Sequence, residues 1–130
     1  MSEHPNVARI KAGYAAFSTG DLAALNDLFT EDLLWHVGGR NQLVGEYRGR
    51  DTVYRLMGKV MEVTGGTFHV DVEAILADDT GATALVTITG SRDGHTREAK
   101  SVQVFHLRDG AVIELWEATT SGHAALRACD

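Results

Sequence analysis

Apolar residues recur at helical spacing in three stretches of the first half of the chain. The first stretch covers residues 6–18, the second begins after Asp21, and the third runs from about Asp51 to Gly65. A spacing of three or four residues places these side chains on one face of a helix. Asp21 is a residue type that caps helix N-termini, and glycine commonly follows a helix end, as Gly20 does here. The pattern therefore predicts three amphipathic helices.

From Thr67 onward the apolar positions alternate with polar ones, as in strands that bury one face. Two Asp-Gly pairs, at 93–94 and 109–110, are typical of tight hairpin turns. The pattern predicts four strands, which begin near residues 67, 82, 97 and 112. Leu33–Val37 predicts one further strand, because its large side chains suit a half-buried sheet.

Three helices followed by a strand meander indicate an α+β fold. We expect the helices to pack on the concave face of a curved, mainly antiparallel sheet. A glycine-rich loop is predicted from Gly38 to Gly49, after the strand that carries Trp35 and His36. Helices laid on a curved sheet leave a cone-shaped hollow, so the pattern also predicts a pocket between the two layers.

Composition narrows the function classes. The 130 residues suit a single domain spanning 1–130, and 44% of them are apolar, enough for a packed interior. The net charge is −6 without a basic cluster, which argues against nucleic acid and anionic membranes as partners. No apolar run is long enough to cross a bilayer, and the N-terminal residues lack signal-peptide features. With a single cysteine, Cys129, no internal disulfide can form, and a cytoplasmic location is expected.

Several short motifs resemble one known family. They are Gly20-Asp21, Leu28-Phe29, Asp32, Trp35-His36 and Gly45-x-Tyr-x-Gly49. In this order, with a third helix and four meandering strands, they resemble the SnoaL-like branch of the NTF2-like superfamily. That group includes ketosteroid isomerases, polyketide cyclases, dehydratases and epoxide hydrolases. The resemblance implies the fold and a small-molecule pocket, and it leaves the reaction open because one fold carries many chemistries.

The catalytic groups of a ketosteroid isomerase do not carry over. In register with such an enzyme, Gly13 stands where the oxyanion tyrosine is expected, and Val37 stands at the aspartate base. Gln103 takes the place of the protonated aspartic acid. A valine cannot move a proton, so the resemblance does not imply isomerase activity.

The same register orients the strands relative to the pocket. His36, Lys100, Val104, His106 and Trp116 would face outward, and a slip of one residue would reverse every position. The side chains expected to contact a ligand are Trp35, Val37, Met57, Val86, Ile88, Ser101, Gln103 and Phe105.

Glu117 and His36 are the candidate catalytic residues. Glu117 would face the pocket, where a carboxyl on an apolar wall tends to have a raised pKa. A glutamate at a strand end that is salt-bridged or solvated is the alternative. His36 could act as a general base, although the register points it outward. Gln103 could orient a ligand carbonyl or satisfy a polar neighbour, and Tyr14 is expected in the core.

No cofactor or metal site is predicted. The six histidines show no i,i+4 pair, and neither a phosphate loop nor a nucleophile elbow is present. Two functions remain open: a cofactor-free acid–base enzyme for a small, mostly apolar molecule, and a binding protein without turnover. Two titratable groups facing one hollow would favour the enzyme.

The outer face of the sheet is the last feature of interest. On the same register it carries Val102, Val104, Val112 and Trp116. An apolar patch with a central tryptophan predicts a homodimer through this face. The alternative is that residues 120–130 fold back over Trp116.

Overall fold

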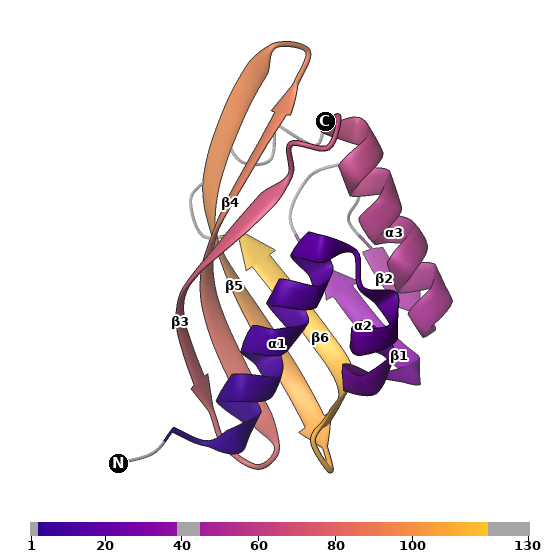
Figure 1. Cartoon of the computed structure of the whole chain (residues 1–130), viewed down its shortest axis with the longest axis vertical. Coiled ribbons are helices and arrows are strands. Elements are labelled where there is room, and N and C mark those ends of the chain that lie inside the picture. The colour runs from indigo at the N-terminus through magenta and orange to yellow at the C-terminus, as the bar shows by residue number, and fades with distance from the viewer. Residues whose placement is uncertain (1–2, 39–44, 120–130) are drawn as a thin grey trace.

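The computed structural model describes residues 3–38 and 45–119, which form three helices and six strands (Figure 1). The elements are α1 (Pro5–Thr19), α2 (Leu22–Leu28), β1 (Phe29–Val37), β2 (Gly45–Arg48), α3 (Arg50–Val63), β3 (His69–Ala77), β4 (Gly81–Arg92), β5 (His95–Arg108) and β6 (Ala111–Thr119). All three helices lie on the same side of a curved sheet, and the β4–β5 hairpin projects beyond them (Figure 1). The α+β architecture predicted from the periodicity is confirmed.

The sheet has the strand order β2-β1-β6-β5-β4-β3. Strands β3 to β6 form the expected antiparallel meander, and β2 pairs antiparallel with β1. β1 and β6 pair in parallel, so the first strand of the chain lies next to the last. The sheet is therefore mainly antiparallel, as predicted.

Local chemistry sets the ends of these elements. Pro5 occupies the first turn of α1, and the His4 side chain accepts a hydrogen bond from the Asn6 amide. Asp21 caps α2 by accepting from the amide of Ala24 at 3.1 Å. Both Asp-Gly pairs turn with positive φ at each residue, 54° and 78° at 93–94 and 52° and 82° at 109–110. These angles suit the tight hairpins that the sequence predicted.

The structure differs from the prediction at three strands. Residues 45–48 form β2, an edge strand on β1, within the stretch expected to be a loop, and residues 39–44 of that loop lie outside the described residues. In β3 the register shifts between Val72 and Ala74, so the predicted alternation of faces breaks there. The pairing of β5 with β6 also shifts, because His106 pairs with Glu114 whereas Leu107 pairs with Val112. Side chains at the start of β6 therefore point to the opposite face from the one predicted. Val112, expected on the outer face, is fully buried as a result.

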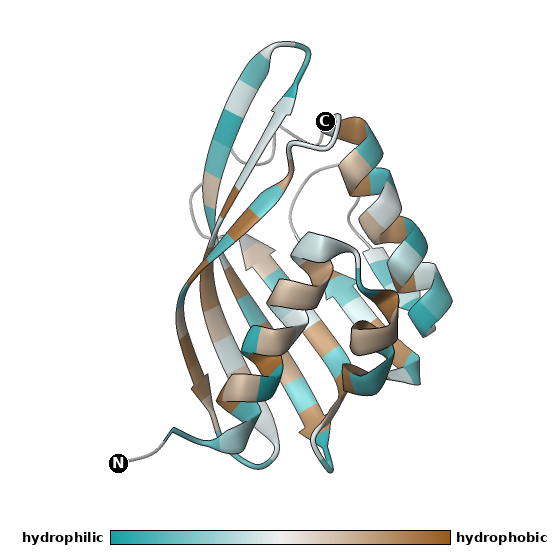
Figure 2. Cartoon of the chain, viewed as in Figure 1, coloured by the Kyte–Doolittle hydropathy of each residue, from teal (hydrophilic) through white to brown (hydrophobic). Residues whose placement is uncertain are grey.

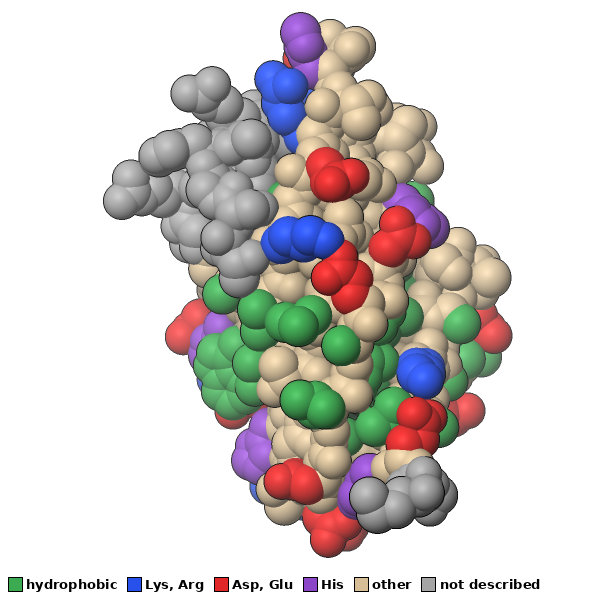
Figure 3. All heavy atoms as spheres, turned by 90° about the vertical axis from the view of Figure 1, so that its left-hand side faces the viewer, with side chains coloured by type: hydrophobic (Ala, Val, Ile, Leu, Met, Phe, Trp, Pro, Cys, Tyr) green, Lys and Arg blue, Asp and Glu red, His purple; other side chains and the backbone are tan. Residues whose placement is uncertain are grey.

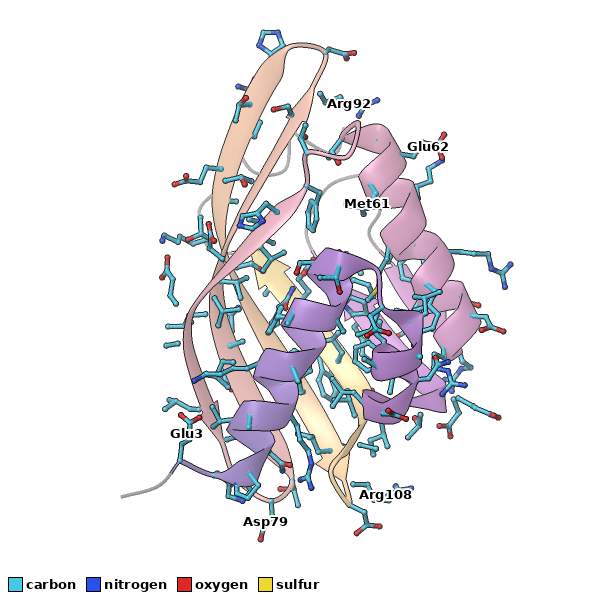
Figure 4. All side chains as sticks on the ribbon, in the orientation of Figure 1. Glu3, Met61, Glu62, Asp79, Arg92 and Arg108 are labelled. Carbon is cyan, nitrogen blue, oxygen red and sulfur yellow. The ribbon has the colours of Figure 1, made fainter. Side chains whose placement is uncertain are left out.

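The core lies between the helices and the inner face of the sheet. Ile10 of α1, Leu33 of β1 and Val53 of α3 are each at most 1% exposed. Coloured by hydropathy, brown and teal residues follow one another along strands of the sheet (Figure 2). Buried residues of all three helices form one core cluster with buried residues of the sheet. At the N-terminal end of α1, His4 Nε2 lies 2.8 Å from Asp79 Oδ1 in the β3–β4 turn. Asp79 is labelled beside that end of the helix in Figure 4. The two layers are thereby joined at one end by packing and by polar contacts.

Gly13 and Gly58 make a matched pair of helical glycines. A Cβ added at Gly13 would lie 2.5 Å from Leu28 Cδ2, whereas a Cβ at Gly58 meets nothing within 4 Å. Gly58→Ala should gain the usual helix stabilisation of about 0.5–1 kcal/mol. Gly13→Ala should lose that gain to overpacking, which costs about 1–3 kcal/mol. Urea unfolding of both variants measures the difference, and equal stabilisation by both would contradict the close approach of α1 and α2.

Candidate active site

A mostly apolar cavity of about 70 Å³ lies between the helices and the inner face of the sheet. Helix and strand side chains fill most of the space between the two layers (Figure 4). The cavity is lined by Ile10, Gly13, Tyr14, Phe17, Leu25, Leu28, Phe29, Trp35, Met57, Phe68, Val70, Gln103, Phe105, Leu115 and Glu117. Four of these side chains carry a polar group, and all four are placed by strands or by α1.

Three of the polar side chains form one hydrogen-bonded chain. The Tyr14 hydroxyl donates to Gln103 Oε1, and Gln103 Nε2 donates to Glu117 Oε2. Gln103 and Glu117 stand directly opposite each other on β5 and β6, where side chains on one face are nearest neighbours. Tyr14 reaches them from α1, and its ring packs edge-on against Phe105 at a centroid distance of 6.2 Å. Two titratable groups therefore meet in one apolar cavity.

Burial changes the acidity of both groups. The apolar surroundings raise the pKa of Glu117 above 4.5, and the Gln103 amide offsets part of that rise by stabilising the carboxylate. Burial also raises the pKa of Tyr14 above 10.0, and the negative charge of Glu117 adds to the rise. Tyr14 therefore stays a neutral phenol, and Glu117 favours its protonated form more than an exposed glutamate does.

Trp35 is the fourth polar residue of the cavity. Its Nε1 is buried, and among the described residues it is the single buried side-chain nitrogen or oxygen without a hydrogen-bond partner. Leaving such a donor unpaired costs on the order of 1–3 kcal/mol. An orphaned donor in a side chain that lines a cavity is a group that a bound molecule can satisfy.

Half of the sequence-predicted site residues line this cavity. They are Trp35, Met57, Gln103, Phe105 and Glu117. The other inward-facing candidates lie on the same side of the sheet and do not line the cavity: Val37 and Val86 are buried, Ile88 packs against the core, and the Ser101 hydroxyl donates to the carbonyl of Ala118 at 3.2 Å.

His36 lies on the opposite face of the sheet from the cavity. Its ring stacks on Trp116 at a centroid distance of 5.3 Å and an interplanar angle of 10°. Its Nε2 lies 2.6 Å from Glu114 Oε2, and its Nδ1 lies 3.3 Å from Glu46 Oε1. The alternation along β1 turns Trp35 inward and His36 outward, and the pairing of β1 with β6 continues without a register shift from Leu34 to Val37. Of the two catalytic candidates, Glu117 alone lines the cavity.

Tyr14 is the residue that sequence reasoning undervalued. Its position on the apolar face of α1 indicated a core role, and its ring does pack against the core. The hydroxyl, however, meets a partner that is 89 positions away in the sequence. A tyrosine among aliphatic helix positions was the available signal, because a buried tyrosine hydroxyl usually finds a partner.

Other kinds of site have less support in the described parts of the chain. No group of three or more His, Cys, Asp or Glu side chains within residues 3–38 and 45–119 is arranged to hold a metal ion. None of the helices described is long and apolar enough to cross a membrane.

Fold and cavity together define an NTF2-like domain, with helices laid on a curved sheet around an apolar hollow. A family model described as the SnoaL-like domain matches residues 10–115, and the chain belongs to that family. The resemblance seen in the sequence is thus confirmed.

Known relatives agree with this assignment. Bal32a, encoded by a soil-derived mobile gene cassette, is 30% identical with a TM-score of 0.90 over 96% of both chains. The uncharacterised protein Mb0035 of Mycobacterium bovis is 28% identical over 90% of both chains. TerC, crystallised with polyporic acid, shares the fold with a TM-score of 0.79 at 21% identity, covering 90% of this chain and 92% of its own.

Proposed function

We propose that this SnoaL-like protein binds a small, mostly apolar molecule in the cavity and that Glu117 acts on it as a cofactor-free acid–base group. The observation that carries the proposal is the chain from Tyr14 through Gln103 to Glu117 inside apolar walls. TerC, which shares this fold, was co-crystallised with polyporic acid, which supports a small-molecule-binding role.

The raised pKa of Glu117 suits proton transfer. A carboxyl whose pKa is raised holds its proton to a higher pH than an exposed glutamate, so it can donate the proton to an oxygen of a bound molecule and take a proton back from a neighbouring atom. Gln103 would hold the carboxyl in place, and the neutral Tyr14 hydroxyl would orient Gln103. This chemistry fits isomerisation, cyclisation, dehydration or hydrolysis without a cofactor.

A binding protein without turnover is the second candidate. It is favoured by Val37, which replaces the catalytic aspartate of the isomerases, and by the apolar character of most cavity residues. The presence of two titratable groups, Glu117 and Tyr14, in one hollow favours the enzyme over a binding protein. Both candidates require that a molecule enters the cavity.

Two methionines on α3 provide a test of occupancy. Met57 lines the cavity, whereas Met61, one turn further along the same helix, is 37% exposed and is labelled in Figure 4. Met57→Trp should fill the cavity and weaken binding of toluene at least about tenfold, equivalent to ~1.4 kcal/mol. Met61→Trp should leave toluene binding unchanged.

Ligand-observed NMR titration measures both affinities. Toluene that fails to bind the wild type, or that binds Met57→Trp as tightly as the wild type, would contradict a ligand-binding role for this cavity.

We also propose that the protein forms a homodimer through the outer face of the sheet. Four large apolar side chains are exposed there on neighbouring strands: Leu76 by 75%, Leu85 by 46%, and Val104 and Trp116 by 39% each. Val104 pairs with Trp116, Thr83 lies between Val104 and Leu76, and Leu85 is two positions after Thr83 on β4; we call these four apolar side chains the outer patch. Hydrophobic side chains gather in the middle of the β3 side of the molecule (Figure 3). The alternative cover, residues 120–130, lies outside the described residues.

A further inference from the structure

The indole nitrogen of Trp35 indicates what the cavity binds. It is a donor and never an acceptor, so only a hydrogen-bond acceptor can satisfy it. Trp35 lines the cavity, and its Nε1 is buried without a partner among the described residues. Buried polar groups in folded proteins are nearly always paired, so an unpaired one in a side chain that lines a cavity points to a partner that arrives from outside.

The charges around the cavity limit that partner further. Among the described residues that line the cavity, Glu117 is the single carboxyl, and none is a Lys, Arg or His. An anionic ligand would meet the Glu117 carboxyl in apolar surroundings without a compensating cation from these residues. An uncharged acceptor does not bring this cost of a second, uncompensated charge. When the Glu117 carboxyl is protonated, it can also donate a hydrogen bond to such an acceptor.

Strand pairing brings Trp35 and Glu117 close to one binding position. Trp35 pairs with Leu115, and Val37 pairs with Glu117, so Trp35 and Glu117 stand two residues apart on neighbouring strands. Both residues face inward. Neighbouring strands are about 4.8 Å apart and two residues span about 6.6 Å, so their Cα atoms lie roughly 8 Å from each other. A small molecule bound between these two strands therefore lies near both residues.

We propose that the cavity takes an uncharged molecule whose carbonyl or hydroxyl oxygen accepts a hydrogen bond from Trp35 Nε1, and that it excludes carboxylates. The proposal rests on the proposed function, because it names the chemical class of the molecule bound at that same site. Trp35 is here a residue that determines specificity, and the acid–base role stays with Glu117.

Three single-ring probes test the proposal. Acetophenone carries the acceptor oxygen, α-methylstyrene has the same shape with a CH₂ group in place of that oxygen, and benzoate carries a charge. Proton–nitrogen NMR spectra of the labelled protein show an indole signal for each of the two tryptophans. Trp35→Phe identifies the Trp35 signal by removing it, and the Trp116 signal serves as an internal reference on the outer face.

In the wild type, acetophenone should bind about three- to tenfold more tightly than α-methylstyrene, the usual gain from one hydrogen bond. Acetophenone should move the Trp35 indole signal and leave the Trp116 signal in place. Benzoate should bind at least about tenfold more weakly than acetophenone. In Trp35→Phe the preference for acetophenone should disappear, whereas the matched Trp116→Phe variant should keep it.

Equal affinities for acetophenone and α-methylstyrene, with an unmoved Trp35 signal, would overturn the proposal while the cavity remains a binding site. Benzoate binding as tightly as acetophenone would overturn the exclusion of carboxylates. If none of the three probes binds, the proposed function fails, and this proposal fails with it. The wild-type affinities and spectra distinguish these outcomes even if Trp35→Phe does not fold.

Discussion

Raising the pH above 4.5 is expected to lower the free energy of unfolding through Glu117, and Glu117→Gln is expected to remove that loss. The folded-state pKa of Glu117 is raised above 4.5 by burial. Below pH 4.5 the carboxyl is protonated in both states and costs nothing. Between pH 4.5 and the raised pKa, the unfolded chain releases the proton while the folded chain keeps it. Stability then falls by about 1.4 kcal/mol per pH unit until the folded carboxyl ionises.

The measurement is urea unfolding of the wild type and Glu117→Gln across pH 4 to 9. The variant should overtake the wild type as the pH rises, because glutamine keeps the hydrogen-bonding shape without the charge. Glu98→Gln is the matched control, since Glu98 is exposed on β5 and its loss changes the net charge equally. Parallel pH profiles for the wild type and Glu117→Gln would show that Glu117 is not held in an apolar site.

Trp116→Lys is expected to dissociate the homodimer without unfolding the domain. Trp116 is part of the outer patch and is 39% exposed in the single chain, so lysine at this position remains solvated in a monomer. In a two-fold dimer the change occurs twice, and central tryptophans contribute about 2 kcal/mol or more each. The dimer dissociation constant should therefore rise about a hundredfold or more.

Sedimentation or light scattering at micromolar protein gives the mass. The wild type should weigh twice the chain mass of 14.0 kDa, and Trp116→Lys should weigh 14.0 kDa with an unchanged circular dichroism spectrum. Leu22→Lys is the control, since Leu22 is 51% exposed on α2, away from the outer face. A wild type that is monomeric under these conditions would exclude the dimer.

The helices and hairpins could be predicted because their signals are local. Helical spacing defined α1 and α3, and the Asp-Gly pairs placed two turns whose positive φ angles the structure confirms. Both patterns depend on residues that are close in sequence. The inward orientation of Gln103 and Glu117 came from the register of the family resemblance, and both residues line the cavity.

The bulges and the polar chain could not be predicted, because they depend on distant partners. In β6 the residues around Val112 are apolar on both sides, so an inserted residue leaves no trace in the alternation. The short edge strand β2 lies among glycines that favour a loop. The link from Tyr14 to Gln103 joins a helix to a strand late in the chain, and nothing near Tyr14 indicates that partner.

The parallel pairing of β1 with β6 has a consequence for how the molecule is made. His36 of β1 contacts Glu114 of β6, 78 positions later, so one edge of β1 has no neighbour until the final strand leaves the ribosome. Contacts this distant in sequence close late in folding, because the loop entropy is lost before the contact forms. The cavity needs Trp35 from the first strand and Glu117 from the last. We therefore expect the pocket to be completed last, during synthesis and during refolding alike, after the local hairpins have formed.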